Sequence, residues 1–109
     1  MSYRNRMGTD VMRVLAEQTS DINQPHIFDF YFYFKDEITA RSAADQLRDA
    51  GFKTVVRPGA DNLNWLCLST KGIIPSEQGL NSLGNDLEDL ALKYQGEFDG
   101  WECATAKHS

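Results

Sequence analysis

The side chains best suited to catalysing a reaction are Cys67 and His26, which could act as a thiol nucleophile and its general base. Cys67, however, stands inside a strand-like segment between Leu66 and Leu68, where a buried and unreactive thiol is expected. We find no serine–histidine–aspartate set, no pair of carboxylates with a reason to meet, and no glycine-rich loop for phosphate. The sequence therefore predicts a protein without enzymatic activity and without catalytic residues.

Metal and disulfide chemistry has equally little support in the sequence. Cys67 and Cys103 are too few for a disulfide framework and lack C-x-x-C spacing, while His26 and His108 are far apart. No apolar segment follows the arginines near the N-terminus, so we expect no signal peptide, and no apolar run approaches the ~20 residues of a membrane-spanning helix. We expect a reduced, cytoplasmic protein with no metal and no cofactor.

Acidic side chains are concentrated in the last third of the chain. The formal net charge is −5 and the sequence pI is about 4.8, which disfavours binding to a phosphate backbone. Between Pro75 and Glu102 the only basic residue is Lys93, and the acidic residues are Glu77, Asp86, Glu88, Asp89, Glu97, Asp99 and Glu102. Most acidic faces are only solvated, but a surface of this kind also suits a basic partner.

An amphipathic helix lies within this acidic region, with Ser76 as its expected N-cap. Its apolar stripe has spacings of three and four residues and consists of Leu80, Leu83, Leu87, Leu90, Ala91 and Tyr94. The opposite face carries Asn85, Glu88, Asp89 and Leu92. An apolar residue ringed by acids could anchor a basic segment, although a single exposed leucine is ordinary and a neighbouring helix could cover it. These four residues are the first candidate site for a partner.

The segment HIFDFYFYF, residues 26–34, alternates strictly between two faces, as a β-strand does. Its phenylalanines are expected to face the core, whereas Tyr31 and Tyr33 face the other way. Aromatic rings on an open sheet are how RNA-recognition motifs stack bases, so an RNA-binding sheet is the alternative function. The acidic balance and the sequence LNWLCLST, which lacks that motif's third-strand pattern, disfavour direct nucleic-acid binding. Tyr31 and Tyr33 are therefore a second, weaker candidate site for a partner.

The predicted elements follow the order of a short N-terminal helix and then β-α-β-β-α-β. This order predicts a ferredoxin-like α+β fold, in which a four-stranded antiparallel sheet carries two helices on one face. Right-handed crossovers give the strand order 4-1-3-2, so Cys67 and Cys103 lie about 9–10 Å apart across the sheet and cannot form a disulfide. We expect a single domain over residues 10–105, a flexible tail over residues 1–9 and a second tail over residues 106–109.

The stretch GEFDGWEC, residues 96–103, decides whether one strand or a hairpin ends the fold. Asp99-Gly100 is a strong hairpin signal, which would make two short strands. A β-bulge at the same dipeptide would instead shift the side-chain phase by one residue and place Phe98 and Trp101 on one face. The bulge gives the cleaner pattern and supplies the single last strand that the fold needs, so we favour it.

The residues that carry the next observation are DINQPHIFDFYFYF, AADQLRDAGFKTVV and LEDLALKYQGEFDGWECA. Together they resemble the RraB domain family, named for the regulator of ribonuclease E activity B. The resemblance covers roughly Asp10 to Ala104, and its most specific parts are the FDFYFYF strand and the GEFDGWE ending. The family's ferredoxin-like fold agrees with the arrangement that the pattern of the residues predicts.

The resemblance implies a regulatory role without catalysis. Studied members are small acidic bacterial proteins that bind ribonuclease E, in the region that scaffolds the RNA-degrading assembly, and restrain its activity toward certain transcripts. The implied partner is thus a ribonuclease or its scaffold region, and the implied function is modulation of RNA turnover. Enterobacterial members continue into a long acidic tail, whereas this sequence stops at ATAKHS. No family motif marks catalytic residues, so none is transferred.

Overall fold

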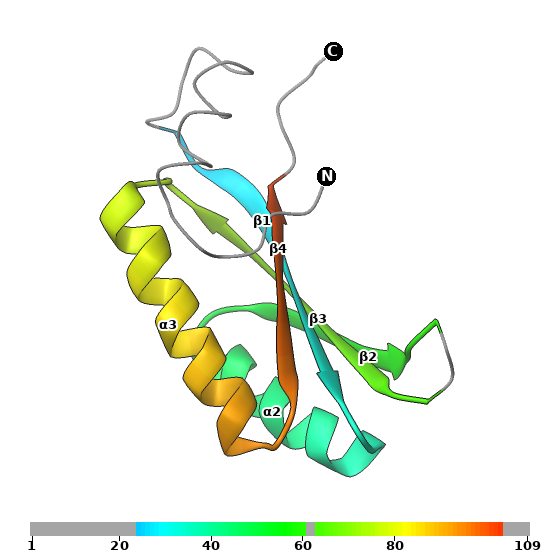
Figure 1. Ribbon diagram of the computed structural model, residues 1–109. Coiled ribbons are helices and arrows are strands. Elements are labelled where there is room, and N and C mark those ends of the chain that lie inside the picture. Colours follow the sequence, from blue (N-terminus) through cyan, green and yellow to red (C-terminus); the bar gives the residue numbers. More distant parts are fainter. Residues whose placement is uncertain (1–23, 61–62, 104–109) are drawn as a thin grey trace.

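The computed structural model describes residues 24–60 and 63–103 (Figure 1). The expected N-terminal helix and the expected tails lie outside these residues. The elements are β1 (His26–Phe34), α2 (Glu37–Asp49), β2 (Lys53–Pro58), β3 (Trp65–Ile73), α3 (Glu77–Lys93) and β4 (Glu97–Cys103). This β-α-β-β-α-β order is the one that the sequence predicts, and it is consistent with the ferredoxin-like fold.

The four strands form one antiparallel sheet in the order β2-β3-β1-β4. Counted from the β4 edge, this is the order 4-1-3-2, with β1 and β3 in the centre. The segment LNWLCLST, which the sequence indicates as the third strand, stops at Thr70, three residues before the end of β3. The strand continues to Ile73, because Gly72 and Ile73 pair with Ile27 and His26 at the start of β1.

The core lies between the sheet and the two helices. The phenylalanines of β1 (Phe28, Phe30, Phe32 and Phe34) are all buried on the helix side, as the alternation predicts. They pack against the small side chains of α2 and against Leu80 and Leu87 of α3. The small α2 residues are Ala40, Ala43 and Ala44, and they let this helix lie close to the bulky rings. Both helices therefore cover the same face of the sheet.

The helix ends have the capping residues that local chemistry favours. The Asp36 carboxylate accepts a hydrogen bond of 2.8 Å from the Thr39 amide, so Asp36 is the N-cap of α2. The α2 helix ends at Asp49, and Gly51, which follows the C-cap Ala50, has a φ of 97° in the left-handed region. The expected N-cap of α3, Ser76, accepts a hydrogen bond of 3.0 Å from the Gly79 amide.

The last strand is one strand with a bulge, as the phase of its side chains predicts. Phe32 pairs with Phe98 and Phe30 pairs with Trp101, so Asp99 and Gly100 together stand opposite a single residue of β1. Gly100 adopts a φ of 101°, which a residue with a side chain rarely takes. The bulge brings both aromatic side chains onto the helix side, where Trp101 is buried.

Candidate functional site

The first candidate site lies along the outer face of α3, which is formed by Asn85, Glu88, Asp89 and Leu92. All four residues are exposed, and 71% of Leu92 is accessible to solvent. Their spacing of three or four residues places them one above another on a helix whose opposite side is buried. The structure therefore brings these candidate residues together, and they separate two hollows on the surface.

One hollow lies between α3 and β4, which run side by side (Figure 1). We call it the α3–β4 groove; its volume is about 310 Å³ and it is lined by Glu88, Ala91, Leu92, Gly96, Glu97 and Phe98. Apolar side chains form its floor, and one carboxylate stands on each element. Glu88 and Leu92 belong to the predicted site, whereas the sequence analysis assigned the other lining residues no role in binding.

The connection between α3 and β4 explains why this groove exists. The helix ends at Lys93, and the amide of Gly96 returns a hydrogen bond of 2.8 Å to the carbonyl of Ala91. Gln95 takes up a φ of 58°, so the chain reverses within a few residues and β4 starts beside the last turns of the helix. Ala91 is small and leaves room between the two elements.

The floor of the groove is held by the aromatic core. The Phe98 ring, only partly buried, lies with its centroid 5.0 Å from that of Phe32. A side chain at position 96 would collide with the Phe34 ring and would come within 2.7 Å of the Tyr33 carbonyl oxygen. Gly96 therefore permits a close approach of backbone to ring that no other residue allows.

A second hollow, the α2–α3 groove, lies on the other side of α3 and has a volume of about 340 Å³. Asp86 and Asp89 line it, but so does Lys93. The Lys93 ammonium donates a hydrogen bond of 3.1 Å to the side chain of Gln46 and lies 5.4 Å from the centre of the Tyr94 ring. This groove is therefore of mixed charge, unlike the α3–β4 groove.

The second candidate site, Tyr31 and Tyr33, lies on the face of the sheet that the helices leave open. The Tyr31 hydroxyl donates a hydrogen bond of 2.9 Å to the Glu102 carboxylate. Burial, followed by the hydrogen bond and charge of Glu102, raises the pKa of Tyr31 to about 12. The hydroxyl of Tyr31 is therefore engaged in a hydrogen bond that links β1 to β4, whereas its ring is only partly buried.

Carboxylates surround both tyrosines. Asp29 adds its negative charge beside Tyr31 and accepts a hydrogen bond of 2.9 Å from Thr70, while Glu97 pairs with Tyr33 across the sheet. Lys53 and Arg57 are exposed on β2, at the opposite edge of the sheet. The rings that could stack on bases are thus the part of this face least suited to a phosphate backbone.

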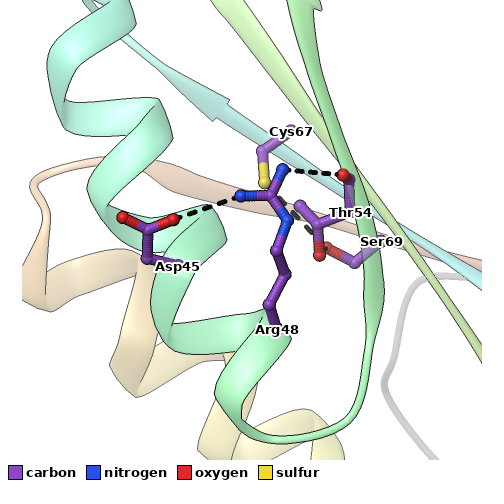
Figure 2. A network of polar contacts seen from close by, with 5 residues as sticks. All are labelled: Asp45, Arg48, Thr54, Cys67 and Ser69. Carbon is purple, nitrogen blue, oxygen red and sulfur yellow. Dashed lines mark hydrogen bonds and ion pairs between the residues drawn. The ribbon is translucent and has the colours of Figure 1, made fainter.

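Cys67 lies beside Arg48, Thr54 and Ser69 in a cluster of polar contacts between α2 and the sheet (Figure 2). Arg48 donates hydrogen bonds of 3.1 Å to Asp45 and 2.9 Å to the carbonyl of Thr54, whose hydroxyl lies 3.2 Å from that of Ser69. Burial raises the pKa of the Cys67 thiol to about 11, and the smaller effects of Ser69 and Arg48 do not offset it.

The geometry also separates Cys67 from its imagined base. Cys67 pairs with Phe32, whereas His26 begins β1 six residues earlier, about 20 Å away at the rise of a strand. Cys67 and Cys103 are both thiols and form no disulfide. Cys67 is therefore a packing residue, as the sequence around it predicts.

The described residues also hold neither a metal site nor a membrane-spanning helix. Within residues 24–60 and 63–103, no group of three or more histidine, cysteine, aspartate or glutamate side chains could hold a metal ion. None of the helices in these ranges is both long and apolar enough to span a membrane.

Comparison with known families places residues 5–103 in the family described as RraB, Regulator of ribonuclease activity B. The chain belongs to the RraB family. The match includes all four described strands and both described helices. The family assignment therefore applies to the whole of the described domain. A search of curated proteins found no match. The family description names regulation of ribonuclease activity. The question for the surface of α3 is therefore whether it can contact a ribonuclease.

Sequence reasoning identified two of the six residues that line the α3–β4 groove of this RraB chain. It selected α3 residues by their position opposite the leucine stripe, which was sufficient for Glu88 and Leu92. It assigned Phe98 to the core, which is correct, but did not recognise that the ring also reaches the surface. The usable signal was Gly96 directly after a helix, because a tight return places the first residues of β4 against the last turns of α3.

Proposed function

We propose that this chain is a cytoplasmic, non-enzymatic regulator that binds ribonuclease E, or the scaffold region of that enzyme, and thereby restrains RNA cleavage. The observation that carries the proposal is the match to the regulators of ribonuclease activity B over residues 5–103. The proposed contact surface is the outer face of α3 with its adjoining grooves.

The charges of the molecule support a protein partner over RNA. The aromatic residues Tyr31 and Tyr33 have Asp29, Glu97 and Glu102 as neighbours, and a phosphate backbone would be repelled there. The exposed Leu92, by contrast, is an apolar residue among carboxylates, which suits a protein segment with both apolar and basic side chains. The buried and protonated Cys67 offers no nucleophile for catalysis.

The test is a titration of purified ribonuclease E with the purified chain, after both have been treated with nuclease and repurified. We expect saturable binding without RNA and a matching decrease in the cleavage rate of a defined transcript. A ribonuclease E variant that lacks the scaffold region separates the two proposed contacts, because binding to the scaffold would be lost and binding to the catalytic part would be retained. Absence of both binding and inhibition would refute the proposal.

The alternative of an RNA-binding sheet gives a different result in the same titration. Binding that depends on RNA, and that is lost in Tyr31→Ala and Tyr33→Ala but retained in Leu92→Ala, would move the contact to the open face of the sheet. The three substitutions remove exposed or partly exposed side chains, so each variant can be checked for an unchanged fold before binding is measured.

A further inference from the structure

We propose, on the basis of the function proposed above, that the α3–β4 groove holds a partner segment in which one large apolar side chain stands between lysines or arginines. The apolar side chain would enter the groove, and its basic neighbours would lie against Glu88 and Glu97. The proposal names the chemistry of the partner segment and the surface that reads it.

The apolar part of the segment follows from what lines the groove. Leu92 is 71% exposed and Phe98 is partly exposed, and the buried Ala91 lines the groove with them. A large apolar side chain placed there would remove Leu92 and the exposed part of Phe98 from water together. The volume of about 310 Å³ is at the lower end of the ~300–1,000 Å³ usual for ligand pockets, so it suits a side chain rather than a folded surface.

The basic part of the segment follows from the charges. Glu88 on α3 and Glu97 on β4 are exposed and both line the groove, Glu97 at the edge where β4 pairs with Tyr33. Among the described residues that line the groove there is no lysine or arginine. In the α2–α3 groove, Lys93 lies beside Asp86 and Asp89 and offsets part of their charge. Attraction for a cation is therefore stronger in the α3–β4 groove than in the α2–α3 groove. For this reason we assign the basic partner segment to the α3–β4 groove.

The groove is formed before any partner binds. Phe98 is held against Phe32 at a centroid distance of 5.0 Å, and the backbone at Gly96 lies against the Phe34 ring. These contacts belong to the buried core and fix the floor of the groove relative to α3. A partner segment would therefore meet a rigid apolar floor, which lowers the entropy lost on binding.

The first experiment uses a synthetic peptide as the probe, so it does not depend on ribonuclease E. The peptide carries one leucine between two pairs of arginines, and its binding to the nitrogen-15-labelled chain is followed by NMR. We expect the amide signals of Leu92, Gly96 and Phe98 to move. Two control peptides, one with glycine in place of the leucine and one with glutamates in place of the arginines, should each bind at least about tenfold more weakly.

Paired substitutions then locate the site. Leu92→Ala should weaken peptide binding about tenfold, while Ile38→Ala, which removes a similarly exposed apolar side chain from α2, should leave binding unchanged. Glu88→Lys with Glu97→Lys should abolish measurable binding. Asp86→Lys with Asp89→Lys makes the same change of charge around the α2–α3 groove and should weaken binding only through the overall charge.

The outcomes separate this proposal from the proposed function. Signal changes confined to the α2–α3 groove, to the open face of the sheet or to no residues at all would overturn the groove assignment. If ribonuclease E were still bound and inhibited in that case, the regulatory function would stand without this groove. Peptide binding in the α3–β4 groove without any binding of ribonuclease E would instead retain the groove and refute the choice of partner.

Discussion

At the scale of single residues, the two faces of β1 make unequal contributions to stability. Phe30 is 1% exposed and lies within the aromatic core, so we expect Phe30→Ala to lower the free energy of unfolding by about 3–5 kcal/mol. Tyr31→Ala removes a half-covered ring and one hydrogen bond to Glu102, for which about 1–2 kcal/mol is expected. Urea unfolding of the two variants measures the difference. A larger loss in Tyr31→Ala would mean that the open face carries the main core.

Cys67 gives stability a dependence on alkaline pH. Burial raises the pKa of its thiol from 9.0 to about 11, so the folded protein keeps a proton that the unfolded chain releases. The stabilisation is complete below pH ~9 and is lost as the pH rises toward ~11. Cys67→Ala should therefore be least stable relative to the parent protein near neutral pH, and the gap should narrow above pH ~9. Urea midpoints across this range test it, and a constant gap would contradict it.

At the scale of elements, the return from α3 to β4 is tightly constrained at Gly96. Gly96→Ala should destabilise the protein by about 1–3 kcal/mol, because its Cβ would collide with the Phe34 ring and with backbone that cannot move aside. Gly72→Ala is the matched control. Its Cβ would meet only Ile27, at an ordinary 3.7 Å, so a change below about 1 kcal/mol is expected. Thermal unfolding of both variants decides the matter; equal stability would show that the connection can relax.

The elements also show what sequence reasoning can and cannot reach. The Ser76 cap and the bulge at Asp99-Gly100 depend on local chemistry and side-chain phase, and both predictions are confirmed. The strand β3 is longer than the predicted segment LNWLCLST, because Gly72 pairs with Ile27 of β1 and this contact between strands is not visible in the local sequence. The α3–β4 groove was not predicted as a whole, because its walls come from two elements whose contact depends on the tertiary fold.

At the scale of the whole molecule, charge and shape divide the surface into regions with different capacities. The helices cover one face of the sheet, so the other face presents partly covered tyrosines with carboxylates beside them. The helix side presents α3 as an acidic ridge between two grooves. An acidic surface repels RNA and attracts basic protein segments. This distribution of charge therefore favours contact with a basic part of a ribonuclease over contact with its RNA substrate.

This charge distribution leads to a prediction about association kinetics. The net charge of −5 should attract a basic segment of ribonuclease E at long range, so the association rate should fall as salt shortens the Debye length. Glu88→Lys and Asp49→Lys each change the net charge from −5 to −3, but only Glu88 lines the α3–β4 groove, whereas Asp49 ends α2. Both variants should lose the same part of the overall attraction, and Glu88→Lys should lose a further part that is local.

The measurement is the association rate constant with immobilised ribonuclease E at low and high salt. We expect the rate for Glu88→Lys to be about tenfold lower than that of the parent protein at low salt and to depend less on salt, with a clearly smaller change for Asp49→Lys. Leu92→Ala should mainly speed dissociation, because it removes a contact and leaves the charge unchanged. Equal rates for the two charge variants would show that α3 attracts its partner only through net charge. In that case the contact would have to be sought on another surface.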